Sequence, residues 1–165
     1  MAALSFAAGC GRGDAPLPAA ATKTAADFFT IPVDGKPVRM QLAIKRGEME
    51  RGLMGRTDLK SDEGMLFIYE APQRMSFWMR NTPTPLDIGF FSPDGTLREI
   101  YQMYPFDETP VPSRGSDLQF ALEMKQGWFE FNDVKPGAKL DLEALAKAVA
   151  ARGLTPSSFG MKSGG

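Results

Sequence analysis

Short apolar segments separated by turn signals dominate the sequence from Phe28 onward. Residues 38–44 alternate apolar Val38, Met40, Leu42 and Ile44 with other side chains, a period of two that is typical of a half-buried strand. The strongest turn signals are Asp34-Gly35-Lys36-Pro37 and Ser92-Pro93-Asp94-Gly95, and each lies between two apolar segments. This succession predicts a mainly β fold, either a β-sandwich or a partly closed barrel, with one or two short helices.

The predicted elements follow from period and propensity. The expected strands cover residues 28–33, 38–44, 64–69, 75–79, 86–91, 96–103, 118–124 and 138–142. Helices are expected over 48–54 and 143–151, while 127–131 is open to a short helical turn. The connection over 104–117 contains three prolines, which favour an extended path.

The chain of 165 residues is the usual length of one domain. We assign residues 28–154 to a single β-rich domain and residues 155–165 to a loose C-terminal tail. Residues 1–27 form an export-like segment and a flexible linker rich in Ala, Pro, Gly and Thr.

The N-terminal segment Leu4-Ser5-Phe6-Ala7-Ala8-Gly9-Cys10 resembles the end of a bacterial lipoprotein signal, in which Cys10 would be lipidated. No Lys or Arg precedes Cys10 and the apolar part is short, so the signal is incomplete. The expected location is extracytoplasmic, either periplasmic or anchored to the membrane, with the lipid as the only membrane contact. The alternative is a tail with one incidental cysteine.

Missing residue types exclude several kinds of chemistry. The chain has no histidine and a single cysteine, Cys10, so neither histidine-dependent catalysis nor a Cys-based zinc site is expected in the domain. Acid–base work would fall to Asp, Glu, Lys or Tyr. The net charge of −1 gives no reason to expect a nucleic-acid partner. Because the acidic residues and the methionines lack ligand spacing, we predict no metal and no other cofactor.

Several ordered motifs closely resemble the domain of unknown function 192 family. They are Arg51-Gly52-Leu53-Met54-Gly55-Arg56, Gly64-Met65-Leu66-Phe67, Phe77-Trp78-Met79-Arg80-Asn81-Thr82, Pro85-Leu86-Asp87-Ile88, Ala121-Leu122-Glu123 and Gly127. The resemblance implies a compact, mostly β domain of bacteria and archaea that is often exported. It transfers no settled activity. Where the family usually carries a Gly-Asp pair, this chain has Gly137-Ala138.

The polar residues of these motifs form the candidate site. We predict a cleft near Trp78 and Asp87 that binds a small polar ligand or a component of the cell envelope, with carbohydrate as one candidate. An aromatic plane beside oriented polar groups is the usual composition of such a site. The candidate binding residues are Arg51, Arg56, Trp78, Asn81, Thr82, Asp87 and Glu123.

Three alternatives remain open. Each residue has a structural explanation: Trp78 in the core, Asn81 and Thr82 in a turn, and Asp87 paired with an arginine. A carboxylate-based hydrolase would use Asp87 and Glu123 as its catalytic pair if both faced one cleft. A structural or assembly domain would bind no small ligand. We prefer a binding domain to an enzyme.

Overall fold

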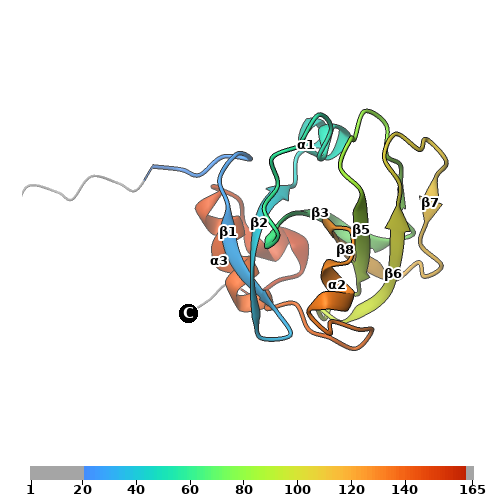
Figure 1. Cartoon of the computed structure of the whole chain (residues 1–165). Coiled ribbons are helices and arrows are strands. Elements are labelled where there is room, and N and C mark those ends of the chain that lie inside the picture. The colour runs from blue at the N-terminus through green and yellow to red at the C-terminus, as the bar shows by residue number, and fades with distance from the viewer. Residues whose placement is uncertain (1–20, 163–165) are drawn as a thin grey trace, which may run out of the picture.

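The computed structural model describes residues 21–162, and these residues form a mainly β domain (Figure 1). Six strands form an open sheet in the order β1-β2-β3-β8-β5-β6, and the short strands β4 and β7 pair separately. The predicted mainly β fold is confirmed, although the sheet does not close into a barrel. The strands are β1 (Phe29–Val33), β2 (Lys36–Ala43), β3 (Glu63–Gln73), β4 (Ser76–Phe77), β5 (Leu86–Phe91), β6 (Leu97–Met103), β7 (Val111–Pro112) and β8 (Leu118–Lys125).

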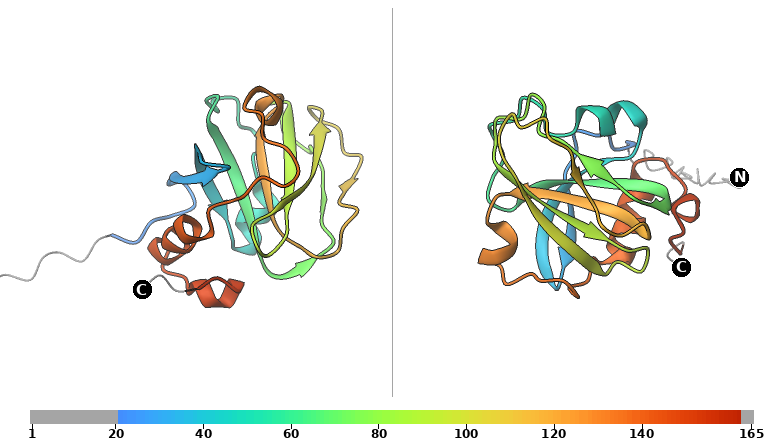
Figure 2. Two further views of the ribbon diagram at one scale, coloured as in Figure 1. Left: turned by 90° about the horizontal axis from the view of Figure 1, so that it is seen from below. Right: turned by 90° about the vertical axis from the view of Figure 1, so that its right-hand side faces the viewer.

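Helices lie at the ends and edge of the sheet. The short helices α1 (Arg46–Arg51) and α2 (Trp128–Phe131) lie at opposite ends (Figure 1). The longest helix, α3 (Leu142–Ala151), packs with the 3-10 helix η1 (Pro156–Phe159) beside β1 and β3 (Figure 2). Within residues 21–162, no helix has the length and apolar character needed to cross a membrane.

Both faces of the sheet are buried. Because side chains alternate along a strand, β8 sends Leu122 and Met124 to one face and Ala121 and Glu123 to the other. The first face packs against α2 and α3, and the second against β4, β7 and the loop that contains Leu53. Complete burial of one large apolar side chain contributes about 1.5–3 kcal/mol, so each polar residue on these faces needs an explanation.

The parallel pairing of β2 with β3 requires the chain to cross over the sheet between them. α1 forms the first part of this crossover. One Glu48 carboxylate oxygen accepts hydrogen bonds from the Ile44 and Lys45 N–H groups, and the other accepts one from Arg152 at 2.6 Å. The buried Arg152 also donates to the Leu42 carbonyl at 2.7 Å. These bonds fix α1 against the end of β2 and against the C-terminal end of α3.

Three local predictions are wrong. Residues 138–142 form no strand, because they make only isolated bridges and Asp141 then caps α3 by accepting from the Ala144 N–H at 2.9 Å. The predicted strand over 75–79 is reduced to Ser76–Phe77. The predicted loose tail is packed as far as Met161, because Phe159 and Met161 are buried in the core.

The close packing of β3 against β8 explains why position 64 of the motif is glycine, and it can be tested by substitution. A Cβ atom at Gly64 would lie 2.3 Å from both the Glu123 carbonyl oxygen and the Met124 sulfur. We expect Gly64→Ala to lower the free energy of unfolding by about 2 kcal/mol or more, since backbone and buried side chain must shift. The measurement is urea denaturation of the full chain.

Gly47→Ala is the matched control. Gly47 lies in α1, and a Cβ atom at this position would meet no neighbouring atom within 4 Å. Alanine should therefore stabilise the protein by about 0.5–1 kcal/mol. Equal stability of Gly64→Ala and the wild type would show that β3 and β8 are not packed this closely.

Candidate ligand-binding site

A row of side chains crosses the sheet at the centre of the second buried face. Strand register places Glu123 of β8 opposite Met65 of β3 on one side and opposite Ile88 of β5 on the other. Residues paired in register point to the same face. The complete row is Gln41, Met65, Glu123, Ile88 and Tyr101. Glu123 is therefore a carboxyl group in the middle of a largely apolar face.

Glu123 borders a small cavity of about 40 Å³ between the sheet and the loops above it. The side chain is 4% exposed. A water molecule needs about 10–15 Å³ of such space, so the cavity has room for a small polar group. Its other lining residues are Met49, Glu50, Arg51, Gly52, Leu53, Met54, Phe67, Phe77, Trp78 and Thr82.

The Glu123 carboxyl has no partner that stabilises its charge. Burial raises its pKa to about 8, and burial is the only cause of this shift. Within the described part of the chain, neither a hydrogen-bond donor nor a cation offsets the loss of water around it. Buried polar groups are nearly always paired, so an unpaired carboxyl beside a cavity requires an explanation.

Three loops meet above this cavity, and backbone hydrogen bonds join them. The Gly55 N–H donates to the Asn81 carbonyl at 2.8 Å, and the Thr84 hydroxyl donates to the Arg56 carbonyl at 2.6 Å. The Phe106 N–H donates to the Thr82 carbonyl at 3.1 Å. The loops that follow β4 and β6 thus lie at the same end of the sheet as α1 (Figure 1). This arrangement explains why the two longest motifs occur together.

Two non-glycine residues of these loops have a positive φ and adopt the left-handed backbone conformation. Asn81 has φ of 53°, which asparagine tolerates well, and Phe106 has φ of 60°, which is strained for a bulky residue. The hydrogen bonds of Gly55 to Asn81 and of Phe106 to Thr82 hold this conformation in place. As a result, Phe106 remains 63% exposed beside the loop that carries Trp78.

Trp78 lies at the mouth of the cavity and is 46% exposed. The alternative that placed Trp78 in the core is therefore wrong. The Arg80 guanidinium carbon lies 5.3 Å from the centre of the indole ring, within the range of a cation–π contact. Arg80 also approaches Glu108 at 3.9 Å, so it makes no pair with Asp87.

Arg51 and Arg56 line a second pocket of about 460 Å³ on the other side of the crossover. Arg51, Gly52 and Met54 border both spaces, which are therefore adjacent. Arg56 donates to Asp58 at 2.5 Å and to Gln41 at 2.8 Å, so its charge is already occupied. Arg51 is exposed at the junction of the two spaces.

Asp87 faces the other side of the sheet. It is paired in register with Met124, whereas Glu123 is paired with Ile88, so the two carboxyl groups point to opposite faces. One Asp87 oxygen accepts from the Gly127 N–H at 2.7 Å, and burial raises the pKa of the carboxyl. The hydrolase alternative that paired Asp87 with Glu123 is therefore wrong. The predicted cleft contains Glu123 and not Asp87.

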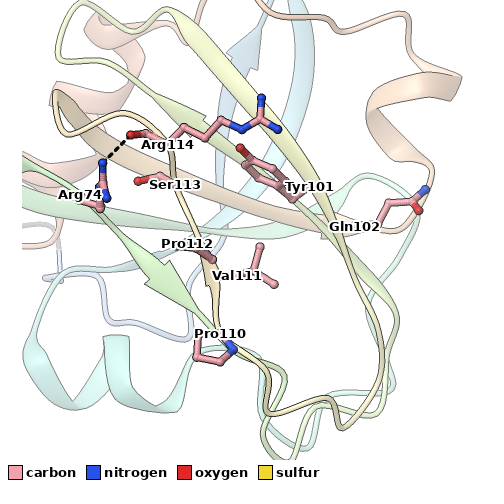
Figure 3. A pocket seen from close by; sticks show the side chains of 8 residues that line it. All are labelled: Arg74, Tyr101, Gln102, Pro110, Val111, Pro112, Ser113 and Arg114. Carbon is pink, nitrogen blue, oxygen red and sulfur yellow. Dashed lines mark hydrogen bonds between the residues drawn. The ribbon is translucent and has the colours of Figure 1, made fainter.

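A larger groove, of about 690 Å³, lies between β6 and β7 (Figure 3). Three of its polar side chains, those of Arg74, Ser113 and Tyr101, already have partners. Arg74 donates to the Arg114 carbonyl at 3.0 Å, and the Ser113 hydroxyl donates to the Gly115 carbonyl at 2.9 Å. The Tyr101 hydroxyl donates to Glu99 at 2.7 Å. We therefore place the candidate site at Glu123 and not at this larger groove.

No metal site accompanies the cavity in residues 21–162, since no group of three or more His, Cys, Asp or Glu side chains is placed to hold an ion. Glu50 is the one other carboxylate that lines the cavity, and Arg46 binds it at 2.7 Å. A divalent cation would thus find one free carboxyl group here. The site is better suited to a guest that needs a single acidic partner.

Of the predicted site residues, the structure brings together Arg51, Trp78, Thr82 and Glu123 around one cavity. Arg56 lines the adjacent pocket and Asn81 holds the loop above, while Asp87 is separate. Their role in binding remains a prediction. The aromatic walls Phe67 and Phe77 were not predicted as site residues, although both lie in the family motifs.

The described residues form a β-rich domain in which the loops that carry the motifs close over the buried Glu123. The sequence matches the DUF192 family, described as "Uncharacterized ACR", over residues 29–142, and the chain belongs to that family. The predicted resemblance is confirmed. Among curated proteins, none matches the chain.

Two solved structures are similar to this chain. One is a protein of unknown function from Novosphingobium aromaticivorans DSM 12444, with 36% sequence identity and a TM-score of 0.64 over 73% of this chain and 98% of that one. The other comes from Sinorhizobium meliloti 1021 and is named a "putative transcription regulator". It has 31% identity and a TM-score of 0.64 over 70% of this chain and 95% of that one.

The raised pKa of Glu123 predicts how stability depends on pH. The folded protein keeps this carboxyl protonated up to about pH 8, whereas the unfolded chain releases the proton near the ordinary value of 4.5. The free energy of unfolding should therefore fall as pH rises between these values, by up to about 1.4 kcal/mol per pH unit. Glu123→Gln removes this titration and should flatten the profile between pH 6 and 8.

Urea denaturation at several pH values measures this slope. The control is Glu70→Gln, because Glu70 is exposed at the far end of β3 and should keep the wild-type slope. A wild-type profile as flat as that of Glu123→Gln would mean that Glu123 is hydrated or paired.

Proposed function

We propose that this domain binds a small polar ligand in the cavity between Glu123 and Trp78. One observation carries the proposal: a carboxyl group that is 4% exposed and has no described partner borders a cavity whose mouth holds a half-exposed indole. The carboxyl provides directed polar contact and the indole provides an apolar plane. This combination is typical of sites for small polar molecules.

A purely structural role explains Glu123 less well. A carboxyl that is buried without a hydrogen bond costs free energy, and an apolar residue of similar size would fill the same position without that cost. The strained backbone of Phe106 also raises the free energy of the folded state, at the same end of the molecule. Such costs gather at functional sites, and both surround the same loops.

Binding is favoured over catalysis because one free acid faces the cavity. General acid–base hydrolysis of a glycosidic bond commonly needs two carboxyl groups about the bond, and Asp87 lies across the sheet. Binding is also favoured over nucleic-acid recognition, which the name of the S. meliloti neighbour would suggest, since this chain has a net charge of −1.

We also propose an extracytoplasmic location with Cys10 as the lipid attachment. Cys10 lies outside the described residues, so this proposal depends on the sequence alone. The ligand would then be a small molecule or a cell-envelope component, with carbohydrate as one candidate.

Titration with a library of sugars, polyols, amino acids and amines, followed by NMR of the full chain, tests ligand binding. We expect the bound compound to perturb the Trp78 indole and the amides of Gly52 and Thr82, which border the cavity. Trp78→Ala should weaken binding about tenfold, which corresponds to about 1.4 kcal/mol.

Phe131→Ala is the matched control. Phe131 is 91% exposed on α2, at the opposite end of the sheet, and its loss should leave the affinity unchanged. The proposal fails if no compound perturbs these signals, or if Phe131→Ala weakens binding as much as Trp78→Ala.

A further inference from the structure

We propose that the group that enters the cavity is a protonated amine, held by an ion pair with Glu123 and by the aromatic walls around it. The inference rests on the proposed function and specifies the chemical class of its ligand. It requires a guest with a small ammonium head, whose remaining part extends past Trp78.

The walls of the cavity suit a cation. The Phe67 and Phe77 rings lie edge to face with centroids 4.9 Å apart, and Trp78 continues this aromatic surface to the mouth. Aromatic faces attract ammonium groups, most strongly where water is excluded. An anion would meet these rings and the acid of Glu123, and Arg51 would be its one cationic partner in the lining.

No described cation of the protein serves Glu123. Arg56 binds Asp58, and Arg39 binds Glu63 at the edge of the same face. Arg51 borders the cavity, but its guanidinium does not compensate the charge of Glu123, because burial alone determines the raised pKa of that carboxyl. A guest that brings its own positive charge supplies what this site lacks. A neutral hydroxyl would supply a hydrogen bond only.

The size of the cavity limits the guest. A space of about 40 Å³ accepts an ammonium or methylammonium group but excludes a sugar ring. The bulk of a larger ligand would therefore lie at the mouth, beside the exposed part of Trp78. Selectivity would depend on the charged head inside the cavity.

Binding of an amine should depend on pH, because the ion pair requires ionised Glu123. Burial raises the pKa of Glu123 to about 8. About 1% of the carboxyl is then ionised at pH 6 and about 90% at pH 9, so the affinity should rise about 90-fold between them. Simple aliphatic amines remain protonated over this range, as lysine does.

Other titratable and charged groups on the elements around Glu123 do not explain such a change. They are Glu50 and Arg51 on α1, Tyr69 on β3 and Tyr101 on β6. Glu50 is paired with Arg46. The pKa values of both tyrosines are raised, Tyr69 by burial and Tyr101 by its hydrogen bond to Glu99. Neither therefore titrates between pH 6 and 9.

The test is an NMR titration of the full chain with methylammonium chloride at pH 6 and pH 9, at constant total chloride. Methanol serves as the neutral probe of similar size, and tetramethylammonium as a cation too large for the cavity. We expect methylammonium to perturb the signals of the Trp78 indole and the Phe67 ring, with an affinity about 90-fold higher at pH 9 than at pH 6. The other two probes should bind far more weakly.

Two variants at pH 9 complete the design. Glu123→Gln keeps the shape of the side chain but not its charge, and it should remove methylammonium binding. Glu70→Gln removes an exposed acid and should leave binding unchanged. If Glu123→Gln does not fold, the wild-type pH dependence alone decides.

The failures are distinguishable. Methanol binding as tightly as methylammonium, without pH dependence, would overturn the amine inference and leave the proposed binding function intact. Methylammonium binding that survives Glu123→Gln would also overturn it. If no probe perturbs the cavity and the wider library also fails, both the inference and the proposed function fall.

Discussion

The parallel pairing of β2 with β3 is the constraint on which the rest of this domain depends. The other strand pairs of this sheet are antiparallel. The parallel pair obliges residues 44–62 to run from the end of β2 back toward its start, because β3 begins there, with Glu63 opposite Arg39. That return path carries α1 and the loop around Gly52 over a sheet face that would otherwise be open. Glu48 and Arg152 fix its start, the Asn81 carbonyl accepts from the Gly55 N–H near its middle, and the Asp62 carbonyl at its end accepts from the Arg39 N–H. The cavity exists because this path passes above Glu123 without filling the space.

The same arrangement makes Glu123 costly. On β8, the neighbours of Glu123 across the sheet are Met65 and Ile88, so the residues directly opposite it offer no polar partner. A residue in this position loses water when the crossover closes over it and gains no compensating contact from the protein. The Glu123 carboxyl therefore lowers the stability of the folded domain, while it is the group proposed to bind the ligand. Because Glu123 has already lost its water on folding, a ligand that pairs with it would not have to displace that water. Preorganised sites bind more tightly for this reason.

The limits of prediction from the sequence follow from the same geometry. Local alternation in residues 38–44 and 118–124 was sufficient to predict strands, because the period of two is a property of the segment itself. Whether Asp87 and Glu123 share a face depends on register between β5 and β8, which are far apart in the chain. A shift of one residue would reverse the answer, and no local pattern fixes it. Trp78 was equally ambiguous, since β4 ends at Phe77 and alternation no longer applies beyond it.

The motif loops form a hydrogen-bonded cover over the cavity. The cavity is small, so a ligand with a body larger than its head must approach past Trp78, where the loops after β4 and β6 meet. Those two loops are joined by two backbone hydrogen bonds, each worth about 0.5–1.5 kcal/mol. The Met79 N–H donates to the Asp107 carbonyl at 2.8 Å, and the Phe106 N–H donates to the Thr82 carbonyl at 3.1 Å and holds Phe106 in a strained conformation. By contrast, Glu123 and Phe67 lie on central strands and cannot move without disrupting the sheet. The acid at the base of the cavity is therefore fixed by the sheet, whereas its cover depends on a few hydrogen bonds between loops.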